Sequence, residues 1–381
     1  VACRHGGLRA RDLQALAGMS RCELHCLPTD GPGDVAGLDA LITGGAIDPA
    51  HIVAVMGKTE GNGCVNDYTR EYATVALAGL LALHLGITSA AVRGRIAFVM
   101  SGGTEGVLAP HLSVFTRQPS AAGAPSGAKR LSVGIAATRD FQPEEIGTLA
   151  QVHATAQAVR AAMTDAGIAD VADVHFVQVK CPLLSAARMA EAAARGAATA
   201  TRDTYESMAL SRGASSLGVA LATGEVAEAA LRDGAVLRDE ALWSSVASAS
   251  AGIELQHNVV LVIGMSAAAT GPFVVAHDVM RDAIDAGAVR RALERTGAAP
   301  EDVVNVFAKA EASPDGRVRG WRHTMLNDSD IHSTRHARAA VGGVIASVVG
   351  RTAIYVSGGA EHQGPPGGGP VAVVARCRDT A

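Results

Sequence analysis

Apolar residues form three short, almost continuous runs along the chain, and each run ends on a lysine. The runs cover residues 51–58, 174–180 and 303–309, so the lysines are Lys58, Lys180 and Lys309. Each run follows a short helical pattern and a break that contains glycine or proline; the helical patterns lie at residues 37–42, 159–163 and 289–293. Runs of this length are typical of strands covered on both faces. The pattern therefore predicts three buried strands with a lysine at the end of each.

A second element follows each lysine: an arginine placed before a segment rich in small residues. These arginines are Arg70, Arg212 and Arg338. In the third copy Arg335 competes with Arg338, but the Gly/Ala/Val run begins directly after Arg338 and favours it. We therefore predict a helix that opens at each of the three arginines.

A third element has the pattern Ser-(Gly/Ala)-Gly-x-Glu and also occurs three times, at residues 101–105, 250–254 and 357–361. Two copies follow clear strands, at residues 95–100 and 352–356. Each copy precedes another apolar strand, at residues 131–135, 258–263 and 370–374. Glycine turns after strands are common, but three ordered series of lysine, arginine and serine in one chain indicate internal duplication.

The repeats predict an α/β fold of three homologous units, each with a sheet and helices, around a pseudo-threefold axis with one central active site. Linker-like stretches near residues 119–127 and 267–271 separate the units. We divide the chain into an N-terminal extension (1–18), unit A (19–122), unit B (123–268) and unit C (269–381). Residues 22–27 resemble the first strand of unit A, and residues 1–18 receive no role.

Composition agrees with a tightly packed enzyme built from small side chains. The 381 residues are 48% hydrophobic but only 3% aromatic, and they include 43 glycines. A formal net charge of −4 provides no basic field for nucleic acid. No apolar run approaches the roughly 20 residues that a membrane span needs, and the start lacks an apolar signal core. The six cysteines form no CxxC pair and no zinc spacing, which predicts reduced thiols and a cytoplasmic location.

Packing around one axis would bring the lysines, arginines and serine turns together in a single cleft. Arginine forks can donate to carbonyl oxygens, and the turns offer hydroxyl and backbone N–H groups. Such a cleft suits a small three-sided ring with alternating carbonyl and N–H groups. The residues expected to bind this ring are Lys58, Arg70, Ser101, Gly102, Arg212, Ala251, Lys309, Arg338, Ser357 and Gly358.

The chemistry requires a nucleophile and a base. A serine becomes nucleophilic when a neighbouring lysine with a lowered pKa takes its proton. The converging arginines should lower the lysine pKa, because like charges disfavour the ammonium form. Backbone N–H groups of the serine turn, together with arginine, would stabilise the oxyanion. This reaction needs no cofactor for catalysis.

Only one lysine–serine pair is needed for attack. A glutamate lies two residues after the first and third lysines (Glu60 and Glu311) and, on the same strand face, should keep those lysines charged. The middle lysine, Lys180, has no such neighbour. We therefore predict that Ser250 is the nucleophile and Lys180 its activating base.

Three motifs carry a resemblance to a known family, at residues 58–70, 101–107 and 357–365. They resemble the cyanuric acid hydrolase/barbiturase family, and the similarity runs from about Cys22 to the C-terminus. The family's fold, three repeated units around a pseudo-threefold axis with one central site, agrees with the repeats described above. The resemblance implies a homotetrameric enzyme that opens the cyanuric acid ring to carboxybiuret, which loses CO₂ to give biuret.

The resemblance also implies a structural divalent cation in the third unit. The implied ligands are Glu311 and oxygens of the loop at Ala360, Gln363, Gly364, Pro365 and Gly368. One carboxylate, an amide and backbone carbonyls suit Mg²⁺ or Ca²⁺ rather than zinc.

Other interpretations remain open. The nearest is a barbiturase, which would hydrolyse barbituric acid to ureidomalonate. A binding protein without catalysis would use the same cleft only to hold a metabolite. A penicillin-binding-type serine hydrolase would require partner motifs that the chain lacks. Cys64 as a thiol nucleophile, His323 or His336 as bases, and His362 as a catalyst are less favoured than solvated or structural roles for these side chains.

Overall fold

The computed structural model describes residues 19–120, 128–232 and 234–378. Within these residues the strands form three larger sheets and one two-stranded hairpin. The first sheet contains β1 (Ser20–Pro28), β2 (Ile52–Thr59), β3 (Ala97–Gly102), β4 (His111–Pro119) and β9 (Ala269–Thr270). The second contains β5 (Arg130–Ala137), β6 (Val174–Pro182), β7 (Ala247–Gly252) and β8 (Val259–Ser266). The third contains β10 (Phe273–Met280), β11 (Val303–Ala310), β14 (Tyr355–Gly358) and β15 (Gly369–Arg376).

The three sheets share one strand order: β3-β2-β4-β1, β7-β6-β8-β5 and β14-β11-β15-β10, with β9 added at the edge beside β1. In each sheet the lysine strand is parallel to the serine strand on one side and antiparallel to its other neighbour. The predicted α/β class is therefore confirmed. The predicted extension at 1–18 and most of the linker at 119–127 lie outside the described residues.

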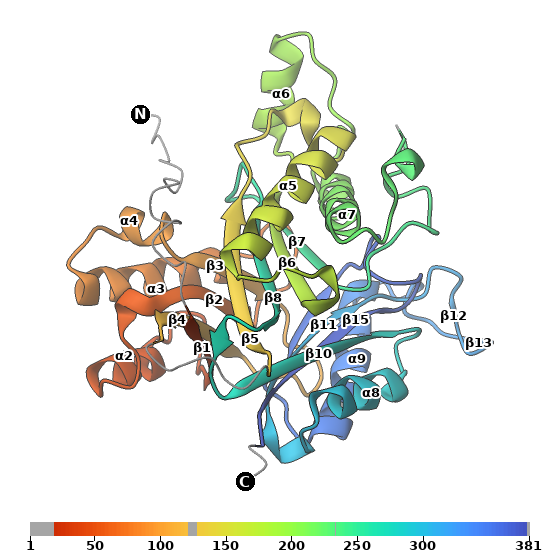
Figure 1. Ribbon diagram of the computed structural model, residues 1–381. Coiled ribbons are helices and arrows are strands. Elements are labelled where there is room, and N and C mark those ends of the chain that lie inside the picture. Colours follow the sequence, from red (N-terminus) through yellow and green to blue (C-terminus); the bar gives the residue numbers. More distant parts are fainter. Residues whose placement is uncertain (1–18, 121–127, 233, 379–381) are drawn as a thin grey trace.

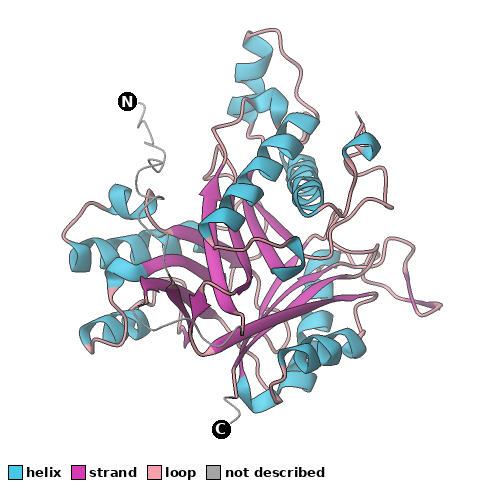
Figure 2. Cartoon of the chain, viewed as in Figure 1, coloured by secondary structure: helices cyan, strands magenta, loops and turns pink. Residues whose placement is uncertain are grey.

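Helices surround the sheets, which face one another at the centre of the molecule (Figures 1 and 2). The α-helices are α2 (Ala36–Thr43), α3 (Thr69–Leu85), α4 (Ser89–Arg93), α5 (Leu149–Asp165), α6 (Ala186–Ala194), α7 (Thr204–Thr223), α8 (Ala286–Thr296) and α9 (Ser333–Val349). Short 3₁₀ helices η2 (Pro49–His51), η4 (Val171–Asp173) and η6 (Pro300–Asp302) directly precede the lysine strands. The remaining short elements are η3 (Pro143–Glu145), η5 (Glu228–Ala230), β12 (Arg317–Val318) and β13 (Trp321–Arg322).

A single apolar core joins the three sheets. Its ring contacts centre on Phe307 of β11, whose centroid lies 6.0 Å from Phe115, 5.7 Å from Phe176 and 5.8 Å from Tyr355. Apolar residues of all three sheets belong to this cluster, and separate clusters fill the space between each sheet and its helices. The lysine strands of the three sheets are therefore packed against one common centre.

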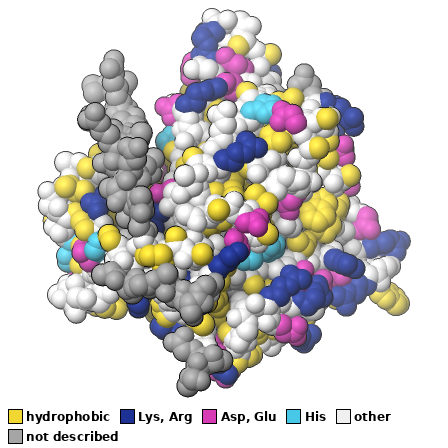
Figure 3. Space-filling view, in the orientation of Figure 1, with side chains coloured by type: hydrophobic (Ala, Val, Ile, Leu, Met, Phe, Trp, Pro, Cys, Tyr) yellow, Lys and Arg dark blue, Asp and Glu magenta, His cyan; other side chains and the backbone are white. Residues whose placement is uncertain are grey.

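The surface view agrees with the low net charge. On the face shown in Figure 3, basic and acidic side chains are interspersed. Arginines gather around α8, but Arg291 and Arg319 there pair with Asp278 and Asp282. Among the described helices, none combines the length and the apolar character needed to cross a membrane.

The structure corrects two sequence-based assignments. The strand that follows the first serine turn is β4, whereas residues 131–135 lie in β5 of the second sheet. The strand β4 mixes buried polar residues, such as His111 and Ser113, with apolar ones, so its hydrophobic pattern is weak.

The second correction concerns the helices that carry the arginines. Helix α7 begins at Thr204 and α9 at Ser333, so Arg212 and Arg338 lie inside their helices; Arg70 alone of the three is in a first turn. The start of α7 is set by Asp203, whose side chain accepts a hydrogen bond from a backbone N–H of the first turn. The small-residue run thus marks a packed helix face rather than a helix start.

Candidate active site

The three lysines are buried at the ends of their strands. The exposed fractions of Lys58, Lys180 and Lys309 are 1%, 2% and 0%. In the parallel register of each sheet they lie opposite three serines, as the pairs Lys58 and Ser101, Lys180 and Ser250, and Lys309 and Ser357. Each predicted lysine–serine pair is therefore present, one in each sheet.

Each lysine side chain also reaches the serine strand of another sheet. The ammonium group of Lys180 donates to the carbonyl of Met100 on β3 at 3.2 Å. That of Lys309 donates to the carbonyl of Ala249 on β7 at 2.9 Å. The Lys58 ammonium lies 5.7 Å from the centroid of the Tyr355 ring on β14. These contacts run from the second sheet to the first, from the third to the second and from the first to the third, so the three pairs converge.

Burial is the main reason that all three lysines have lowered pKa values. It lowers the pKa of Lys58 well below its usual range, and Arg338 adds to this effect. Burial and then Arg212 lower the pKa of Lys309 to about 7. The arginines therefore act as predicted, but as a smaller cause than the loss of hydration.

The first and third pairs have the same internal geometry. Lys58 Nζ donates to Ser101 Oγ at 3.2 Å, and Lys309 Nζ donates to Ser357 Oγ at 3.1 Å. Each ammonium group also donates to the carbonyl oxygen of the residue after its serine. Both lysines are thus held by acceptors from their own serine turns.

The middle pair is different. Ser250 Oγ accepts a hydrogen bond from Gln178 Nε2 at 3.2 Å, and Lys180 Nζ lies 3.3 Å from a carboxylate oxygen of Glu254. Burial lowers the pKa of Lys180, Glu254 opposes that effect and Arg70 adds to it. Burial alone would raise the pKa of Glu254, but Lys180 and Arg70 hold it below its usual value.

These contacts overturn the reason given for choosing Lys180. Glu60 is exposed, because β2 ends at Thr59 and the chain turns away from Lys58. Lys180, predicted to have no carboxylate neighbour, contacts Glu254, which the serine turn brings back over the strand end. Glu311 does raise the pKa of Lys309, although burial and Arg212 outweigh it. A choice among the three pairs must therefore rest on other features.

Two of the arginines bind glutamates of serine turns from other sheets. Nε and Nη2 of Arg212 both donate to the carboxylate of Glu361. The same two nitrogens of Arg338 donate to the carboxylate of Glu105. Arg335 contacts Glu105 through a single longer contact of 3.4 Å and is 40% exposed at its side chain, whereas Arg338 is buried. Arg338 is therefore the arginine of the third sheet that enters the site.

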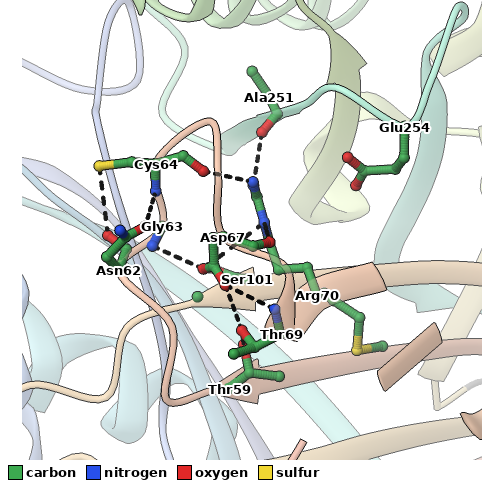
Figure 4. Close-up of polar contacts among 12 residues, drawn as sticks. Thr59, Asn62, Gly63, Cys64, Asp67, Thr69, Arg70, Ser101, Ala251 and Glu254 are labelled. Atoms are coloured by element: carbon green, nitrogen blue, oxygen red, sulfur yellow. Dashed lines mark hydrogen bonds and ion pairs between the residues drawn. The ribbon is translucent and has the colours of Figure 1, made fainter. Parts of the chain in front are cut away.

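Arg70 contacts the middle serine turn, at residues 250–254, through a backbone group instead. Its Nη1 donates to the carbonyl of Ala251 at 3.0 Å, and its Nη2 donates to the carbonyl of Cys64 at 2.7 Å (Figure 4). Glu254, the glutamate equivalent to Glu105 and Glu361, is turned to Lys180 instead of Arg70. The three arginines thus complete a second cycle of contacts between sheets, with one departure at Glu254.

The loop at residues 60–67 is organised by a buried residue that the sequence interpretation did not single out. The buried carboxylate of Asp67 accepts from the backbone N–H of Gly63 at 2.8 Å and of Thr69 at 3.1 Å (Figure 4). A Cβ atom on Gly102 would lie 1.7 Å from Asp67 Oδ2, so glycine is required after Ser101. The sequence did contain a signal for this role, namely an acidic residue just before the helix that carries Arg70.

Three of the predicted cation ligands, Glu311, Ala360 and Gly364, line one small cavity, whereas Gln363, Pro365 and Gly368 are not among its lining residues. A space of about 270 Å³ is lined by Glu311, Ala360, Glu361 and Gly364 among others. Burial, and then the neighbouring Glu361, raise the pKa of the Glu311 carboxyl. A cation beside Glu311 would offset both effects, so the donor set fits a hard divalent ion.

The side chain of Gln363 already makes hydrogen bonds to backbone groups. Its Oε1 accepts from the backbone N–H of Ala249 at 2.7 Å, and its Nε2 donates to the carbonyl of Gly359 at 3.1 Å. Gln363 could therefore bind a cation only through its main-chain carbonyl, as could Pro365 and Gly368. The described part of the chain holds no cluster of three or more His, Cys, Asp or Glu side chains suited to a metal. Oxygen ligation by one carboxylate and backbone groups does not require such a cluster.

His362 has a structural position. Its Nε2 accepts from the backbone N–H of Leu237 at 2.8 Å, and its Nδ1 hydrogen-bonds to the carbonyl of Leu242. His336 pairs with Asp328 at 2.9 Å, at an exposed site. These contacts agree with the expectation that neither histidine acts as a base.

Comparison with known proteins places this geometry in a family. The family model described as amidohydrolase ring-opening protein matches residues 23–376. The chain is 62% identical over 362 residues to a cyanuric acid amidohydrolase of Pseudomonas sp. (strain ADP), covering 94% of this chain and 100% of that protein. It is 63% identical over 360 residues to the cyanuric acid amidohydrolase of Bradyrhizobium diazoefficiens, covering 92% and 97%.

Solved structures agree. A cyanuric acid hydrolase structure superposes with a TM-score of 0.92 at 62% identity, over 94% of this chain and 100% of that one. The cyanuric acid hydrolase of A. caulinodans superposes with a TM-score of 0.88 at 55% identity, over 94% and 99%. The match of fold, motifs and length leads to one assignment: this chain belongs to the family of ring-opening amidohydrolases, enzymes that hydrolyse cyclic amides.

Proposed function

We propose that this enzyme opens the ring of cyanuric acid by hydrolysis, with Ser250 as nucleophile and Lys180 as base. The observation that carries the proposal is the convergence of three buried lysine–serine pairs, one from each sheet. Close relatives named as cyanuric acid amidohydrolases support the substrate. Barbituric acid, in which a CH₂ replaces one N–H, is the less favoured substrate.

The proposed architecture is three homologous units, 19–122, 123–268 and 269–381, around a pseudo-threefold axis through one active site. The shared strand order of the three sheets supports it. So do the two cycles of contacts between sheets, one made by the lysines and one by the arginines. We also propose the homotetramer implied by the family resemblance.

Two of the three arginines have groups that are free to bind a ring ligand, whereas all three guanidinium nitrogens of Arg70 donate to backbone carbonyl oxygens. Among the described residues, Nη1 of Arg212 and Nη1 of Arg338 have no hydrogen-bond acceptor, although the other two nitrogens of each guanidinium are bound. Those free groups can donate to ring carbonyl oxygens. Ser101 and Ser357, with Gly102, Ala251 and Gly358 in the adjoining turn positions, would orient the ring for attack at one carbonyl.

Acylation uses the middle pair. Neutral Lys180 removes the proton of Ser250 Oγ while that oxygen forms a bond to a ring carbonyl carbon. The carbonyl electron pair moves onto its oxygen, which backbone N–H groups of the serine turn stabilise. When the electron pair returns, the ring C–N bond breaks and the proton on Lys180 passes to the leaving nitrogen. The opened ring is then a carbamate ester of Ser250.

Deacylation consumes one water. Lys180 takes a proton from the water that attacks the carbamate carbon, and returns this proton to Ser250 Oγ as the ester bond breaks. The product is carboxybiuret, which loses CO₂ to give biuret. No atom changes oxidation state, so the reaction proceeds without a redox cofactor.

The contacts of the middle pair support its selection. The ammonium groups of the other two pairs donate to their serine oxygens, whereas Lys180 contacts Glu254 and leaves the Ser250 oxygen to another donor. Burial lowers the pKa of Lys180, which makes the neutral form of this amine available as a base. Glu254 opposes that effect, and Lys180 and Arg70 keep the pKa of Glu254 itself below its usual value.

The substitution Glu254→Gln tests this role through the pH profile. A lysine base is active in its neutral form, so kcat/KM should rise with pH through the Lys180 pKa. Glu254 raises that pKa, so its removal should move the rising limb to lower pH. The matched variant Glu60→Gln, at an exposed carboxylate, should leave the limb in place. An unmoved limb, or one displaced to higher pH, would contradict the pairing.

We further propose that Mg²⁺ or Ca²⁺ binds Glu311 and main-chain oxygens of the loop at Ala360, Gln363, Gly364, Pro365 and Gly368. The ion would supply positive charge beside two buried carboxylates and tie the loop to β11. Adding either cation to chelator-treated protein should raise Tm by a few °C, a binding effect of about 2–4 kcal/mol at saturating ion. Glu311→Gln should lose the shift, and Glu301→Gln, at an exposed glutamate, should keep it. A wild-type Tm that responds to neither cation would rule out the site.

The direct test of the proposed function is product analysis. Purified protein should convert cyanuric acid to biuret and CO₂ in equal amounts, measured by chromatography and CO₂ release. Barbituric acid assayed alongside should be turned over with a lower kcat/KM. A protein that opens barbituric acid faster, or binds both rings without product, would require a different assignment.

A further inference from the structure

The strand positions next to the three lysine–serine pairs differ among the sheets: the second sheet has two polar side chains there, the third has only the hydroxyl of Tyr355, and the first has none. Two residues before each lysine the side chain is Met56, Gln178 or Phe307, in the order of the sheets. Two residues before each serine it is Val99, Ser248 or Tyr355. Because alternate strand residues share a face, these side chains lie on the same face as the lysines and serines. The second sheet alone therefore has an amide and a hydroxyl beneath its pair.

These two side chains form a buried chain of hydrogen bonds that ends on Ser250. Ser248 Oγ donates to Gln178 Oε1 at 2.7 Å, and Gln178 Nε2 donates to Ser250 Oγ at 3.2 Å. The second amide hydrogen of Gln178 has an acceptor in the carbonyl of Val179, at 3.2 Å. Gln178 and Ser248 are fully buried, at 0% exposure each, and are opposite one another in the β6–β7 register.

A buried amide in an apolar strand destabilises the fold unless its hydrogen bonds are made. The apolar pair of the first sheet, Met56 and Val99, has no such requirement. The effect of the hydrogen-bond network on Ser250 depends on which atom donates and which accepts in the hydrogen bond between Gln178 and Ser250. An amide N–H can only donate, so Ser250 Oγ accepts from Gln178 through one lone pair. The serine proton is then free to point to another acceptor, and Lys180 is the residue opposite Ser250 in the β6–β7 register, although in this structure its ammonium group is bound to Met100 and Glu254 rather than to Ser250.

We propose that Gln178, held by Ser248, is a positioning residue that directs the Ser250 hydroxyl proton to Lys180. The amide also remains within reach of the oxygen as it loses that proton and gains negative charge. This inference rests on the proposed function, since it assigns a role within the Ser250 reaction. It also accounts for why one of three similar pairs is the reactive one.

Replacement with the side chain of the first sheet provides the test. Gln178→Met should lower kcat about 100-fold with KM changed less than about threefold, because the lost donor acts mainly in the transition state. Ser248→Val, which removes only the support of the amide, should lower kcat about tenfold. The matched control Met56→Leu changes the position of the first sheet equivalent to Gln178, two residues before Lys58, and should retain wild-type kcat.

The variant Gln178→Glu separates orientation from packing, because it keeps the shape of the side chain. A protonated carboxyl can donate to Ser250 Oγ, whereas a carboxylate cannot. Burial should raise the pKa of the new carboxyl. The variant should therefore regain activity as pH falls through that pKa, which adds a falling limb on the alkaline side that wild type lacks. A role in packing alone predicts no such limb.

A serine-directed fluorophosphonate probe keeps this test independent of the substrate. Peptide mapping should locate the adduct on Ser250, and Gln178→Met should slow its formation by a factor similar to the loss in kcat. Wild type that labels at Ser250 but does not open cyanuric acid would overturn the proposed function while leaving the Gln178 inference standing. Wild-type kcat and labelling rate in Gln178→Met, or an equal loss in Met56→Leu, would overturn the inference alone.

Discussion

Ser250→Ala is expected to abolish ring opening, whereas Ser101→Ala and Ser357→Ala should each leave slow turnover. Loss of a nucleophile in a serine hydrolase costs about 10⁴–10⁶ in kcat, because the covalent route disappears. Loss of an orienting hydroxyl removes a hydrogen bond to the ring and costs about 10–10³. The structure offers three serines in similar turns, so this contrast identifies the reactive pair.

Three measurements check the contrast. Steady-state kinetics give kcat and KM for each variant, and calorimetry should show that folded Ser250→Ala still binds cyanuric acid. Intact-mass analysis of rapidly quenched enzyme, followed by peptide mapping, locates the carbamate ester. An adduct on Ser101 or Ser357, or substantial activity in Ser250→Ala, would show that another pair reacts.

Lys180→Ala is expected to lower kcat by about 10³–10⁴, the contribution of a lost base to a serine nucleophile. Lys180→Arg should be as inactive, because a guanidinium stays protonated at all working pH values and cannot accept the serine proton. A small amine such as methylamine should partly restore Lys180→Ala, since it can enter the space left by the side chain and act as base.

The control for this experiment is Lys129→Ala. Lys129 lies at the surface, where it pairs with Asp173, and its loss should leave kcat unchanged. Lys58→Ala and Lys309→Ala should impair the enzyme as binding residues, but methylamine should not change their turnover through a proton-transfer step. Retention of more than about a tenth of wild-type kcat in Lys180→Ala would contradict the assignment of the base.

Much of the site could be read from local pattern. The lysine strands were visible as apolar runs because a strand buried on both faces carries no polar alternation. A side chain at Gly102 would collide with Asp67, which explains the glycine after Ser101, whereas the middle copy of the motif has Ala251 at this position. The order of lysine, arginine and serine along the chain recurred because each sheet has the same strand order.

Other features depended on contacts between residues far apart in the chain. The strand β4 and the true starts of α7 and α9 differ from the sequence-based assignments because buried polar side chains and helix caps override hydrophobic pattern. Spacing along one strand placed Glu60 beside Lys58, but the strand ends at Thr59 and the glutamate is exposed.

The sequence by itself therefore determined the α/β class, the lysine–serine pairs and the membership in a ring-opening family, because each is expressed in short, contiguous segments. Only the tertiary structure decided which glutamate faces which cation and which hydroxyl lies above Gln178. Glu254 contacts Lys180 from 74 positions away in the sequence, and Arg338 contacts Glu105 from 233 positions away. Such partners are selected by the packing of three sheets around one core, and no local spacing encodes that packing.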